Sequence, residues 1–440
     1  MVRLGLATLP SHIRRPAFDP ARLGVGIVHL GVGAFHRAHQ AVFTEGALAH
    51  SDADWGIRGF TQRSVAVRDQ LAPQDGLYTL LERGPAAAPP RVIGVVRDVL
   101  TQADDPVAHL ADPAIRVVTL TVTEKGYNDR VIGQLVAALE RRRATHGRGV
   151  SLLSCDNLSG NGTVLREMVT ARLDDRLADW VSANVSFPSS VVDRIVPATT
   201  AADRAYVRDT LGYEDEGVVV GEPFAQWVIE DSFGQGRPAW ERAGAVLTGD
   251  VTPYERAKLR LLNGAHSLLA YTGALAGYET IDEALADERL EAAARGLMVQ
   301  DAAPTLDLPD GFDLAGYQES ILERFANRQL RYRTVQVAGD GSMKVPIRLL
   351  GTVRDRRAAG AEPVWAALGV AAWMVYVADG TRPLDDPNAD ELRKAVNGHD
   401  SPAGIVDALL GVRQVFDEEL AADAVFRALL ITHAGSLLGR

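Results

Sequence analysis

The stretch GIVHLGVGAFHRAH, residues 26–39, joins a short apolar run to a helical pattern through two closely spaced glycines. Residues 26–30 have the composition of a buried strand. Gly31 permits a tight turn after this strand, and Gly33 lets the backbone approach a pyrophosphate at the start of a helix. The third glycine of a GxGxxG fingerprint is missing, and His36 stands in its place. The stretch predicts a dinucleotide-binding turn, with an ordinary strand–helix connection as the alternative.

Strand-like and helix-like segments alternate on both sides of this turn through the first half of the chain. Apolar, β-branched runs are expected to form strands at residues 55–61, 92–99, 115–123 and 150–155. A long helix is expected at residues 162–184. Such alternation predicts a parallel sheet with helices on its faces. Ligands of such sheets lie outside the carboxyl ends of the strands, where the loops TVTEKGY and SCDNLSGNG occur.

The pattern of the sequence changes after about residue 245, where the alternation of strand-like and helix-like segments ends. Long Ala/Leu-rich segments predict helices at residues 253–275, 281–299, 313–326 and 364–378. A chain of 440 residues exceeds what one hydrophobic core usually organises. We therefore expect a dinucleotide-binding domain at residues 1–245 and a mainly helical substrate and catalytic domain at residues 246–440.

Composition and charge narrow the possible partners and locations. The net charge of -11 argues against an obligatory nucleic-acid or anionic-membrane surface. The longest nearly apolar run, residues 369–378, is about half of the roughly 20 residues that a membrane helix needs. Pro10 interrupts the short apolar start, which therefore does not resemble a secretory signal. We expect a cytoplasmic protein, a monomer or small homo-oligomer, with no nucleic-acid or membrane partner.

The stretch YERAKLRLLNGAHSLLAY, residues 254–271, places polar groups in a pattern suited to a buried helix. At 100° per residue, Glu255, Lys258, Asn263 and His266 fall within an arc of roughly 140°. Burial of such groups costs free energy unless they have partners. A lysine that reaches water along its stem and a core histidine would explain the pattern without chemistry, and periodicity alone favours that explanation.

The same polar groups also suit the oxidation of a secondary alcohol by a nicotinamide. This reaction needs a base for the hydroxyl proton and donors for the developing alkoxide, and a lysine with a pKa lowered by burial is such a base. Two asparagine amides can hold the oxyanion. Cys155 is the only cysteine, and His29, His36 and His39 have no recognisable metal spacing, so we expect no metal site.

Two further features leave alternatives open. The second strand ends in Phe60-Thr61-Gln62-Arg63, without the acid that would bind the ribose hydroxyls of NAD, so the preference between NAD and NADP is open. Asn157 and Asn161 follow a strand end, where they are either ligand contacts or turn formers.

With these residues assembled, the sequence resembles the mannitol dehydrogenase family of polyol-specific long-chain dehydrogenases. The resemblance covers nearly the whole chain, and its blocks occur in the family's order. They are IVHLGVGAFHRAHQAVF, TVTEKGY, SCDNLSGNG, VVDRIVPAT, GEPFAQWVIED, KLRLLNGAHS and DGSMKVP. The resemblance implies an α/β Rossmann-type parallel-sheet N-terminal domain, a mostly α-helical C-terminal domain and metal-independent, NAD(H)-dependent hydride transfer.

The resemblance also implies roles for individual residues. Lys258 matches the general acid/base, and Asn157 and Asn263 match the asparagines that polarise the reacting oxygen. His266 matches a substrate-contacting histidine, and Glu255 a proton-relay carboxylate. The matches to the cofactor site are Gly31, Gly33, Phe35, His36, Arg37, Thr123, Glu124 and Asn157. The remaining matches to substrate contacts are Asp193, Lys344 and Arg348.

The block RTVQVAGDGSMKVPIR bears on the substrate. Gln336 and Gly339 stand where mannitol 2-dehydrogenases carry an arginine and a histidine, and the block looks closer to fructuronate reductases. Lys344 and Arg348 would then meet a substrate carboxylate, with a surface charge as the alternative for either. This favours D-mannonate or D-fructuronate slightly over mannitol or arabinitol. A phosphosugar dehydrogenase and a non-catalytic cofactor-binding sensor are further alternatives. The arginines that would serve a phosphosugar are Arg328, Arg331 and Arg333.

Overall fold

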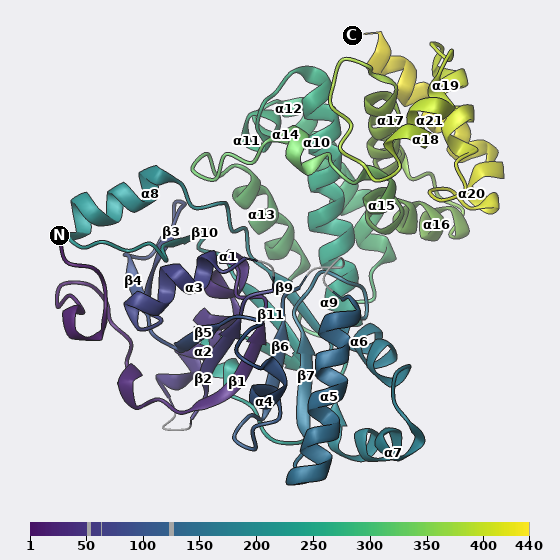
Figure 1. Ribbon diagram of the computed structural model, residues 1–440. Coiled ribbons are helices and arrows are strands. Elements are labelled where there is room, and N and C mark those ends of the chain that lie inside the picture. The colour runs from purple at the N-terminus through teal and green to yellow at the C-terminus, as the bar shows by residue number, and fades with distance from the viewer. Residues whose placement is uncertain (51–53, 63, 123–126, 440) are drawn as a thin grey trace. The chain divides into compact units, whose positions relative to one another are not determined.

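The computed structural model describes residues 1–50, 54–62, 64–122 and 127–439. The chain divides into two compact units, Met1–Thr252 and Pro253–Arg440 (Figure 1). Each unit has hydrophobic core residues of its own. Among the described helices, none combines the length and the apolar character needed to cross a bilayer.

The N-terminal unit is built on a six-stranded parallel sheet with the order β5-β2-β1-β6-β7-β8. The strands are β1 Val25–Leu30, β2 Gly56–Phe60, β5 Val96–Leu100, β6 Val117–Leu120, β7 Val150–Ser154 and β8 Val185–Ser186. Numbered among themselves, they follow the order 3-2-1-4-5-6 of the Rossmann fold. The predicted parallel sheet is confirmed, and its strand order reverses between β1 and β6.

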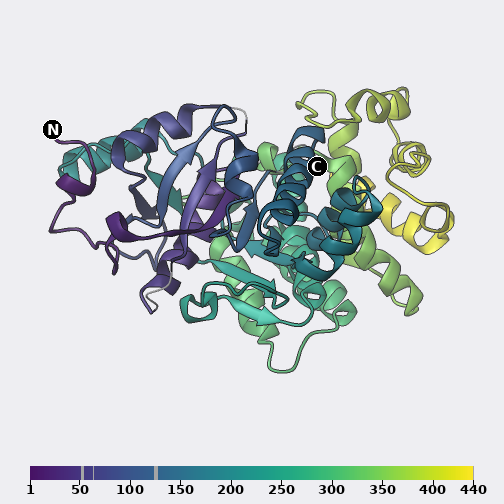
Figure 2. The ribbon, with the colours of Figure 1, turned by 60° about the horizontal axis from the view of Figure 1, so that its bottom comes forward.

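The two faces of this sheet belong to different hydrophobic cores, because side chains alternate along each strand. Ile27 packs in a core with residues of α2 (Gln40–Leu48). Its neighbour Val28 packs in another core with residues of α5 (Asp129–Thr145). The strands and the helices that cover them can be followed from two sides in Figures 1 and 2. Burial of both faces explains why these strands are nearly continuous apolar runs.

One expected strand, residues 92–99, is two strands in different sheets. Gly94 separates β4 (Arg91–Ile93) from β5, and β4 pairs antiparallel with β3 (Tyr78–Glu82). A Cβ on Gly94 would lie 2.7 Å from Pro16, and its N–H donates to Glu45 at 2.9 Å. The chain therefore passes from one sheet to the other at Gly94. Pro16 leaves no room for a side chain at this position. The other strands of the two small sheets are β9 Ser190–Asp193, β10 Val219–Gly221, β11 Gln226–Glu230 and β12 Val246–Thr248.

The helix expected at residues 162–184 is also interrupted. It forms α6 (Asn161–Thr170) and α7 (Asp175–Asn184). The Asp174 carboxylate accepts from the Leu177 N–H at 2.7 Å, so a new helix begins where a side chain caps it. The remaining helices of this unit are α1 Ala34–Ala38, α3 Ala66–Leu71, α4 Pro106–Leu110, α8 Ala201–Tyr206 and the first part of α9 Thr252–Ala257.

The C-terminal unit is helical, which confirms the predicted fold class. Its centre is α17 (Val364–Ala378), which has the bounds expected from the sequence and contacts α10 (Gly264–Ala276) and α21 (Ala424–Leu438). Most side chains of α17 are buried, and they lie on every face of the helix, as a continuous apolar run predicts. The other helices are α11 Ile281–Leu285, α12 Glu288–Gly296, α13 Leu314–Phe325, α14 Thr334–Val337, α15 Gly341–Val345, α16 Gly351–Ala358, α18 Ala389–Val396, α19 Pro402–Leu410 and α20 Glu418–Ala422.

Three π-helical segments interrupt this unit, at Lys258–Asn263, Leu297–Ala302 and Pro346–Leu350. The first contacts both of the others. In the first, the Gly264 N–H bonds the carbonyl of Leu259, five residues earlier, where an α-helix would use the fourth. The continuous α-helix expected at residues 253–275 is therefore wrong in its middle. The spacing of apolar residues in the sequence cannot reveal such a local change of backbone hydrogen bonding.

Candidate functional site

The glycine turn lies where the strand order of the sheet reverses. Gly31 has φ 103°, its N–H donates to Phe60 O at 2.9 Å, and its carbonyl accepts from Thr121 Oγ1 at 2.8 Å. A Cβ on Gly31 would lie 2.3 Å from the Thr121 carbonyl oxygen. Both the backbone conformation and the close approach of β6 therefore require glycine at this position.

Gly33 differs, because no contact among the described residues requires a glycine there. Its φ is -96°, and of the described atoms a Cβ there would meet only the carbonyl oxygen of Gly31, at 3.8 Å. Gly33 borders a cavity of about 290 Å³. The cavity is lined by Gly31, Val32, Gly33, Thr61, Gln62, Ser64, Val67, Thr121, Val122, Asn128 and Arg130. A Cβ on Gly33 would have room within the protein, so glycine here suits a ligand that approaches the backbone closely, as a dinucleotide pyrophosphate does.

The part of this cavity beyond β2 is polar and, among its described lining residues, has no carboxylate. Arg130 lies there and donates through Nη2 to the carbonyl of Gln62 at 2.8 Å. Arg63, the last residue of the FTQR segment named above, lies outside the described residues, as do Thr123 and Glu124. Sequence analysis did not identify Arg130, because it belongs to the helix after β6 rather than to the end of β2.

His29 and His36 lie directly beneath the glycine turn. Their rings are stacked, with centroids 3.4 Å apart and planes 15° apart. Thr119 Oγ1 donates to His29 Nδ1 at 2.7 Å in the tautomer that leaves Nε2–H to donate to Gly31 O at 3.2 Å. Burial lowers the pKa of His29 to about 3 and lowers the pKa of His36 well below its usual value. Both rings are therefore neutral at pH 7.

The neighbouring side chains Phe35 and Arg37 also pack within the protein. Arg37 donates through Nε to the Gly33 carbonyl at 3.3 Å and through Nη1 to the Gly217 carbonyl. Its carbonyl accepts from the Tyr78 hydroxyl at 2.7 Å. Phe35 stacks on His39 with centroids 5.0 Å apart. The side chains of His36 and Arg37 are thus buried beside the turn and support it from within the protein. Neither is among the described residues that line the cavity.

Asp156 links the loops that follow β6 and β7. Its carboxylate accepts from the Val122 N–H at 3.1 Å and from the Tyr127 hydroxyl at 2.8 Å. Burial, together with the charge of Asp156, raises the pKa of Tyr127, which keeps its proton and remains a donor. Sequence analysis did not single out Asp156, although it lies between two residues of the SCDN block.

The two asparagines after β7 have different environments. Asn161 is buried, and its Nδ2 donates to the carbonyls of Asp156 at 2.9 Å and Ser190 at 2.8 Å, while Oδ1 accepts from the Ser190 N–H. These hydrogen bonds give Asn161 a structural role between the loop after β7 and β9. Asn157 lies in the loop between β7 and α6 and is exposed. Asp193, a further expected substrate contact, ends β9 and is buried.

In the C-terminal unit, Lys258 and Asn263 are the first and last residues of a π-helical segment. Lys258 is only 8% exposed, while Asn263 and Glu255 are half-buried. Single π-turns within helices occur often at functional sites. A π-turn contains one extra residue. The arc of roughly 140° that the sequence analysis derived for an ideal α-helix therefore does not give the directions of these side chains.

The orientation of His266 is set by aromatic neighbours. Its ring stacks on Phe325, with centroids 4.9 Å apart and planes 24° apart, and is tilted against Tyr332 at 5.6 Å. Phe325 ends α13, so two helices hold the imidazole between them. His266 is half-buried rather than enclosed, which leaves part of its ring accessible.

Lys344 and Arg348 form a pair of neighbouring cations. Lys344 Nζ donates to the Gly339 carbonyl at 2.6 Å, and Arg348 Nη1 donates to Ser267 Oγ at 3.1 Å. Burial, followed by the charge of Arg348, lowers the pKa of Lys344. Ser267 is buried on α10, one residue after His266, and sequence analysis did not identify it. Two cations held this close favour an anion beside them.

Within the part of the chain that the structure describes, no three His, Cys, Asp or Glu side chains gather closely enough to hold a metal ion.

Comparisons with known families agree with the two units of the fold. The family described as "Mannitol dehydrogenase Rossmann domain" matches residues 25–242, and "Mannitol dehydrogenase C-terminal domain" matches residues 250–436. Together the two matches cover most of the chain.

Relatives with known activities resemble the chain over almost its full length. D-mannonate oxidoreductase of Escherichia coli is 40% identical over 94% of this chain and 93% of that protein. The polyol:NADP oxidoreductase of Gluconobacter oxydans is 36% identical over 90% of each. The ternary complex of Pseudomonas fluorescens mannitol 2-dehydrogenase with NAD and D-mannitol is 38% identical, with a TM-score of 0.87 over 99% of this chain and 97% of that chain. The chain belongs to the mannitol dehydrogenase family.

Proposed function

We propose that this protein transfers hydride between a nicotinamide cofactor and a secondary alcohol of a linear sugar acid, with D-mannonate and D-fructuronate as the favoured pair. The observation that carries the proposal is the placement of Lys258, a nearly buried lysine that begins a π-helical segment. We assign cofactor binding to residues 1–245 and substrate binding and acid–base chemistry to residues 246–440.

The glycine turn is the proposed cofactor site. Gly31 and Gly33 let the backbone approach a pyrophosphate, and His29, His36 and Arg37 hold the turn in place from within the protein. The bound nicotinamide supplies the hydride acceptor for oxidation and the donor for reduction. We favour NAD, which the ternary complex of Pseudomonas fluorescens mannitol 2-dehydrogenase contains. NADP is the alternative, because the described cavity lining beyond β2 has Arg130 and no carboxylate that would bind the ribose hydroxyls of NAD. Thr123 and Glu124 stay in the proposal as further cofactor contacts.

Lys258 is the proposed general acid/base. As hydride leaves the carbinol carbon, the lysine accepts the hydroxyl proton, and in the reverse direction it returns that proton to the carbonyl oxygen. A lysine held out of water suits this task, because burial disfavours the charged ammonium. Glu255, one turn earlier in the chain, is the proposed relay that passes the proton to water.

Amide and imidazole donors complete the proposed chemistry. The Nδ2 groups of Asn157 and Asn263 are assigned to the reacting oxygen, where they stabilise the charge that develops during hydride transfer. His266, which Phe325 and Tyr332 hold in one orientation, is assigned to a substrate hydroxyl. Asp193 is assigned to a hydroxyl further along the substrate.

The choice of a sugar acid rests on Lys344 and Arg348. A carboxylate beside both cations gains charge-assisted hydrogen bonds that a neutral polyol does not offer. The relatives include both a D-mannonate oxidoreductase and a mannitol 2-dehydrogenase, so oxidation of mannitol or arabinitol is the alternative.

The test is a substrate panel monitored at the nicotinamide absorbance band. We expect turnover with D-mannonate and D-fructuronate to exceed that with mannitol, arabinitol and fructose, with NAD(H) and NADP(H) compared in parallel. Arg348→Gln should reduce kcat/KM for the sugar acids far more than for the neutral polyols. A clear preference for mannitol in the unmodified protein would contradict the sugar-acid assignment while leaving the hydride transfer intact.

Lys258→Ala tests the chemical step. We expect kcat to fall by about 10²–10⁴-fold, the range typical of general acid–base catalysis, with binding of the reduced cofactor retained. The matched control is Lys394→Ala, because this lysine lies on α18, outside the proposed site. Normal turnover in Lys258→Ala would overturn the role of the lysine.

Two weaker alternatives are tested by the same panel. The exposed Arg328, Arg331 and Arg333 would favour a phosphosugar, and faster turnover of mannitol 1-phosphate than of D-mannonate would support that activity. Cofactor binding without turnover of any substrate would instead support a non-catalytic cofactor-binding sensor.

A further inference from the structure

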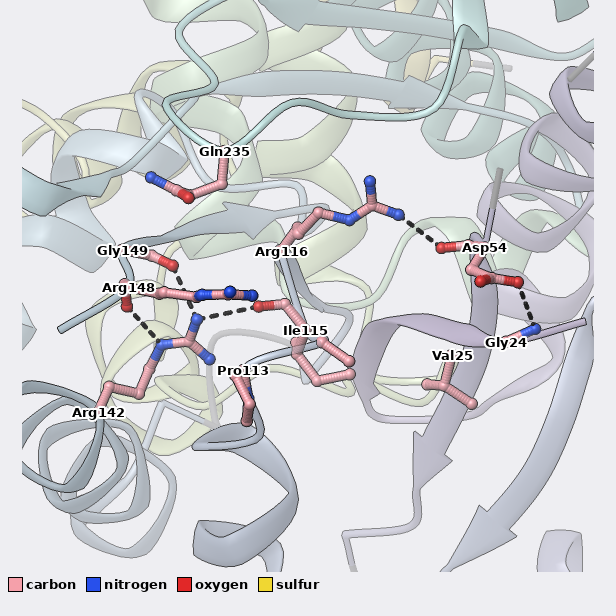
Figure 3. Close-up of a pocket in the computed structure, with 11 residues that line it drawn as sticks. Gly24, Val25, Asp54, Pro113, Ile115, Arg116, Arg142, Arg148, Gly149 and Gln235 are labelled. Carbon is pink, nitrogen blue, oxygen red and sulfur yellow. Dashed lines mark hydrogen bonds between the residues drawn. The ribbon is translucent and has the colours of Figure 1, made fainter. Parts of the chain in front are cut away.

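A second cavity lies at the edge of the parallel sheet opposite the glycine turn. Its volume is about 640 Å³. Its lining includes the residues at or just before the amino ends of β1, β6 and β7, whereas the glycine turn follows their carboxyl ends. The lining residues are Gly24, Val25, Asp54, Pro113, Ala114, Ile115, Arg116, Arg142, Arg148, Gly149 and Gln235 (Figure 3). The cavity is thus separate from the proposed cofactor site.

Arg142 supplies a fixed positive charge at the base of this cavity. It is 1% exposed, and its guanidinium donates to five carbonyl oxygens at 2.7–3.1 Å. The acceptors are the carbonyls of Leu110, Asp112, Ile115, Arg148 and Gly149. Burial lowers its pKa to about 10, so it stays charged at neutral pH. Among the described residues it forms no salt bridge, and its donors are used up, so Arg142 contributes charge but no further hydrogen bond.

Arg116 lies over an aromatic ring. Its guanidinium carbon lies 3.4 Å from the centroid of Trp55, and Nη2 donates to the Asp54 carbonyl at 2.6 Å. No further hydrogen bond of this guanidinium is found within the described residues, so Nε and Nη1 can donate to a ligand. The Asp54 carboxylate, the only acidic side chain in the described lining, accepts from the Gly24 N–H at 2.8 Å. The stacking reduces the freedom of Arg116 before any ligand arrives.

Two further donors come from loops on the other side of the cavity. Arg148 follows α5 and is exposed, and its guanidinium makes no hydrogen bond or salt bridge with the described residues. Gln235 lies across from it, with Nε2 within 3.2 Å of the position that a Cβ on Gly149 would take. A Cβ at Gly149 would also lie 2.0 Å from the Asn184 carbonyl oxygen, so the backbone here is closely packed.

We propose that this cavity binds a small phosphate-bearing molecule, with Arg116 and Arg148 as its direct ligands and Arg142 as the fixed charge behind them. Three arginines face one carboxylate in the lining, in a chain whose net charge is -11. Planar guanidinium groups match the oxygens of a phosphate through paired hydrogen bonds. The volume lies in the range of small-molecule sites and exceeds what one phosphate fills, so the Gln235 amide is assigned to the rest of the ligand.

The experiment measures binding to the full-length protein saturated with reduced cofactor, so that the pyrophosphate site is already filled. The probes are inorganic phosphate, pyrophosphate and ribose 5-phosphate, titrated by calorimetry at constant ionic strength, with potassium chloride as the salt control. We expect ribose 5-phosphate to bind with a 1:1 stoichiometry and more tightly than inorganic phosphate. Equal binding of the two phosphates would assign the site to the phosphate group alone and still support it.

Variants locate the binding. Arg148→Gln should weaken ribose 5-phosphate about tenfold or more, as expected for loss of a charge-assisted hydrogen bond. Arg143→Gln is the matched control, because Arg143, on α5, is also exposed but is not among the lining residues of the cavity. Arg116→Lys keeps the charge and loses the planar fork, so it should also weaken binding while the protein remains folded by circular dichroism. Absence of binding by all three probes, or binding that Arg148→Gln and Arg143→Gln weaken equally, would overturn the proposal.

Discussion

His29 and His36 stack with their ring planes 15° apart beneath the glycine turn, and burial keeps both imidazoles neutral. The unfolded chain takes up a proton at each ring near pH 6.5, whereas the folded chain does not until far lower pH. Their contribution to stability is therefore fully present above pH 6.5 and is lost as the pH falls, down to about pH 3 for His29. The turn that holds the proposed cofactor site is thus sensitive to acid.

We expect the free energy of unfolding to fall by about 1.4 kcal/mol per pH unit for each of these histidines below pH 6. Glu45 acts in the opposite sense, because burial raises its pKa to about 7, so the slope of the unmodified protein combines both. His36→Phe isolates one ring. In urea unfolding between pH 7.5 and 5, the variant should match the slope of the unmodified protein above pH 7 and show a slope smaller by about 1.4 kcal/mol per pH unit below pH 6. His50→Phe is the control, because His50 is exposed. Equal slopes for His36→Phe and the unmodified protein would contradict this assignment.

The two glycines of the turn should respond differently to the same substitution. Gly31→Ala places a Cβ 2.3 Å from the Thr121 carbonyl oxygen at φ 103°, so we expect a loss of about 1–3 kcal/mol in unfolding free energy. The Cβ of Gly33→Ala meets no atom of the described residues closer than 3.8 Å, so this variant should keep its unfolding free energy within about 1 kcal/mol. It should nevertheless weaken binding of reduced cofactor at least about tenfold, since the new methyl group enters the space of the pyrophosphate.

Denaturant unfolding and fluorescence titration with the reduced cofactor, applied to both variants, separate these effects. Each glycine is the control of the other, because the inserted group is identical. Unchanged cofactor affinity in a folded Gly33→Ala protein would place the pyrophosphate elsewhere.

Ser267 should affect activity through Arg348. Its hydroxyl accepts from Arg348 Nη1 at 3.1 Å and fixes the guanidinium beside Lys344. We expect Ser267→Ala to lower kcat/KM for D-mannonate about tenfold through KM, because a charge-assisted hydrogen bond is lost. Mannitol, which has no carboxylate, should be affected much less.

Thr272→Val is the matched control for this variant. Thr272 is buried on the same helix, but its hydroxyl bonds the Leu268 carbonyl within that helix and does not contact Arg348. If Ser267→Ala reduced activity on mannitol and D-mannonate by the same factor, the serine would support the fold rather than the recognition of a carboxylate.

Cys155 should be inert in the native protein. It is the only cysteine, it is 2% exposed, and burial together with the charge of Asp156 raises the pKa of its thiol. Because the thiolate is the reactive form, we expect no labelling by iodoacetamide at pH 8 and no loss of activity, but one labelled thiol per chain in guanidinium chloride. Rapid labelling of the folded protein, measured by mass spectrometry, would show that β7 opens at its carboxyl end.

The parallel sheet was predictable because strands buried on both faces are apolar runs of recognisable length, and β1, β2, β6 and β7 follow this pattern. The division of residues 92–99 into two strands was not predictable. The chain changes sheets at Gly94, where Pro16 and Glu45, both distant in sequence, lie close to the backbone. Helix α17 was predicted with its bounds because an apolar run of that length is itself a buried helix.

The candidate site shows the same division. The sequence and its family resemblance assigned Gly31 and Gly33 to a pyrophosphate, Lys258 to the proton, and Lys344 and Arg348 to a carboxylate, and these roles stay predictions. Tertiary structure decided how they are held. It showed that Gly31 is required by the protein and Gly33 is not, that Asn161 is structural, and that a π-turn replaces α-helical spacing between Lys258 and Asn263. It also brought Arg116, Arg142 and Arg148 to one cavity, because parallel strands and their helices gather residues from separate loops at one edge of the sheet.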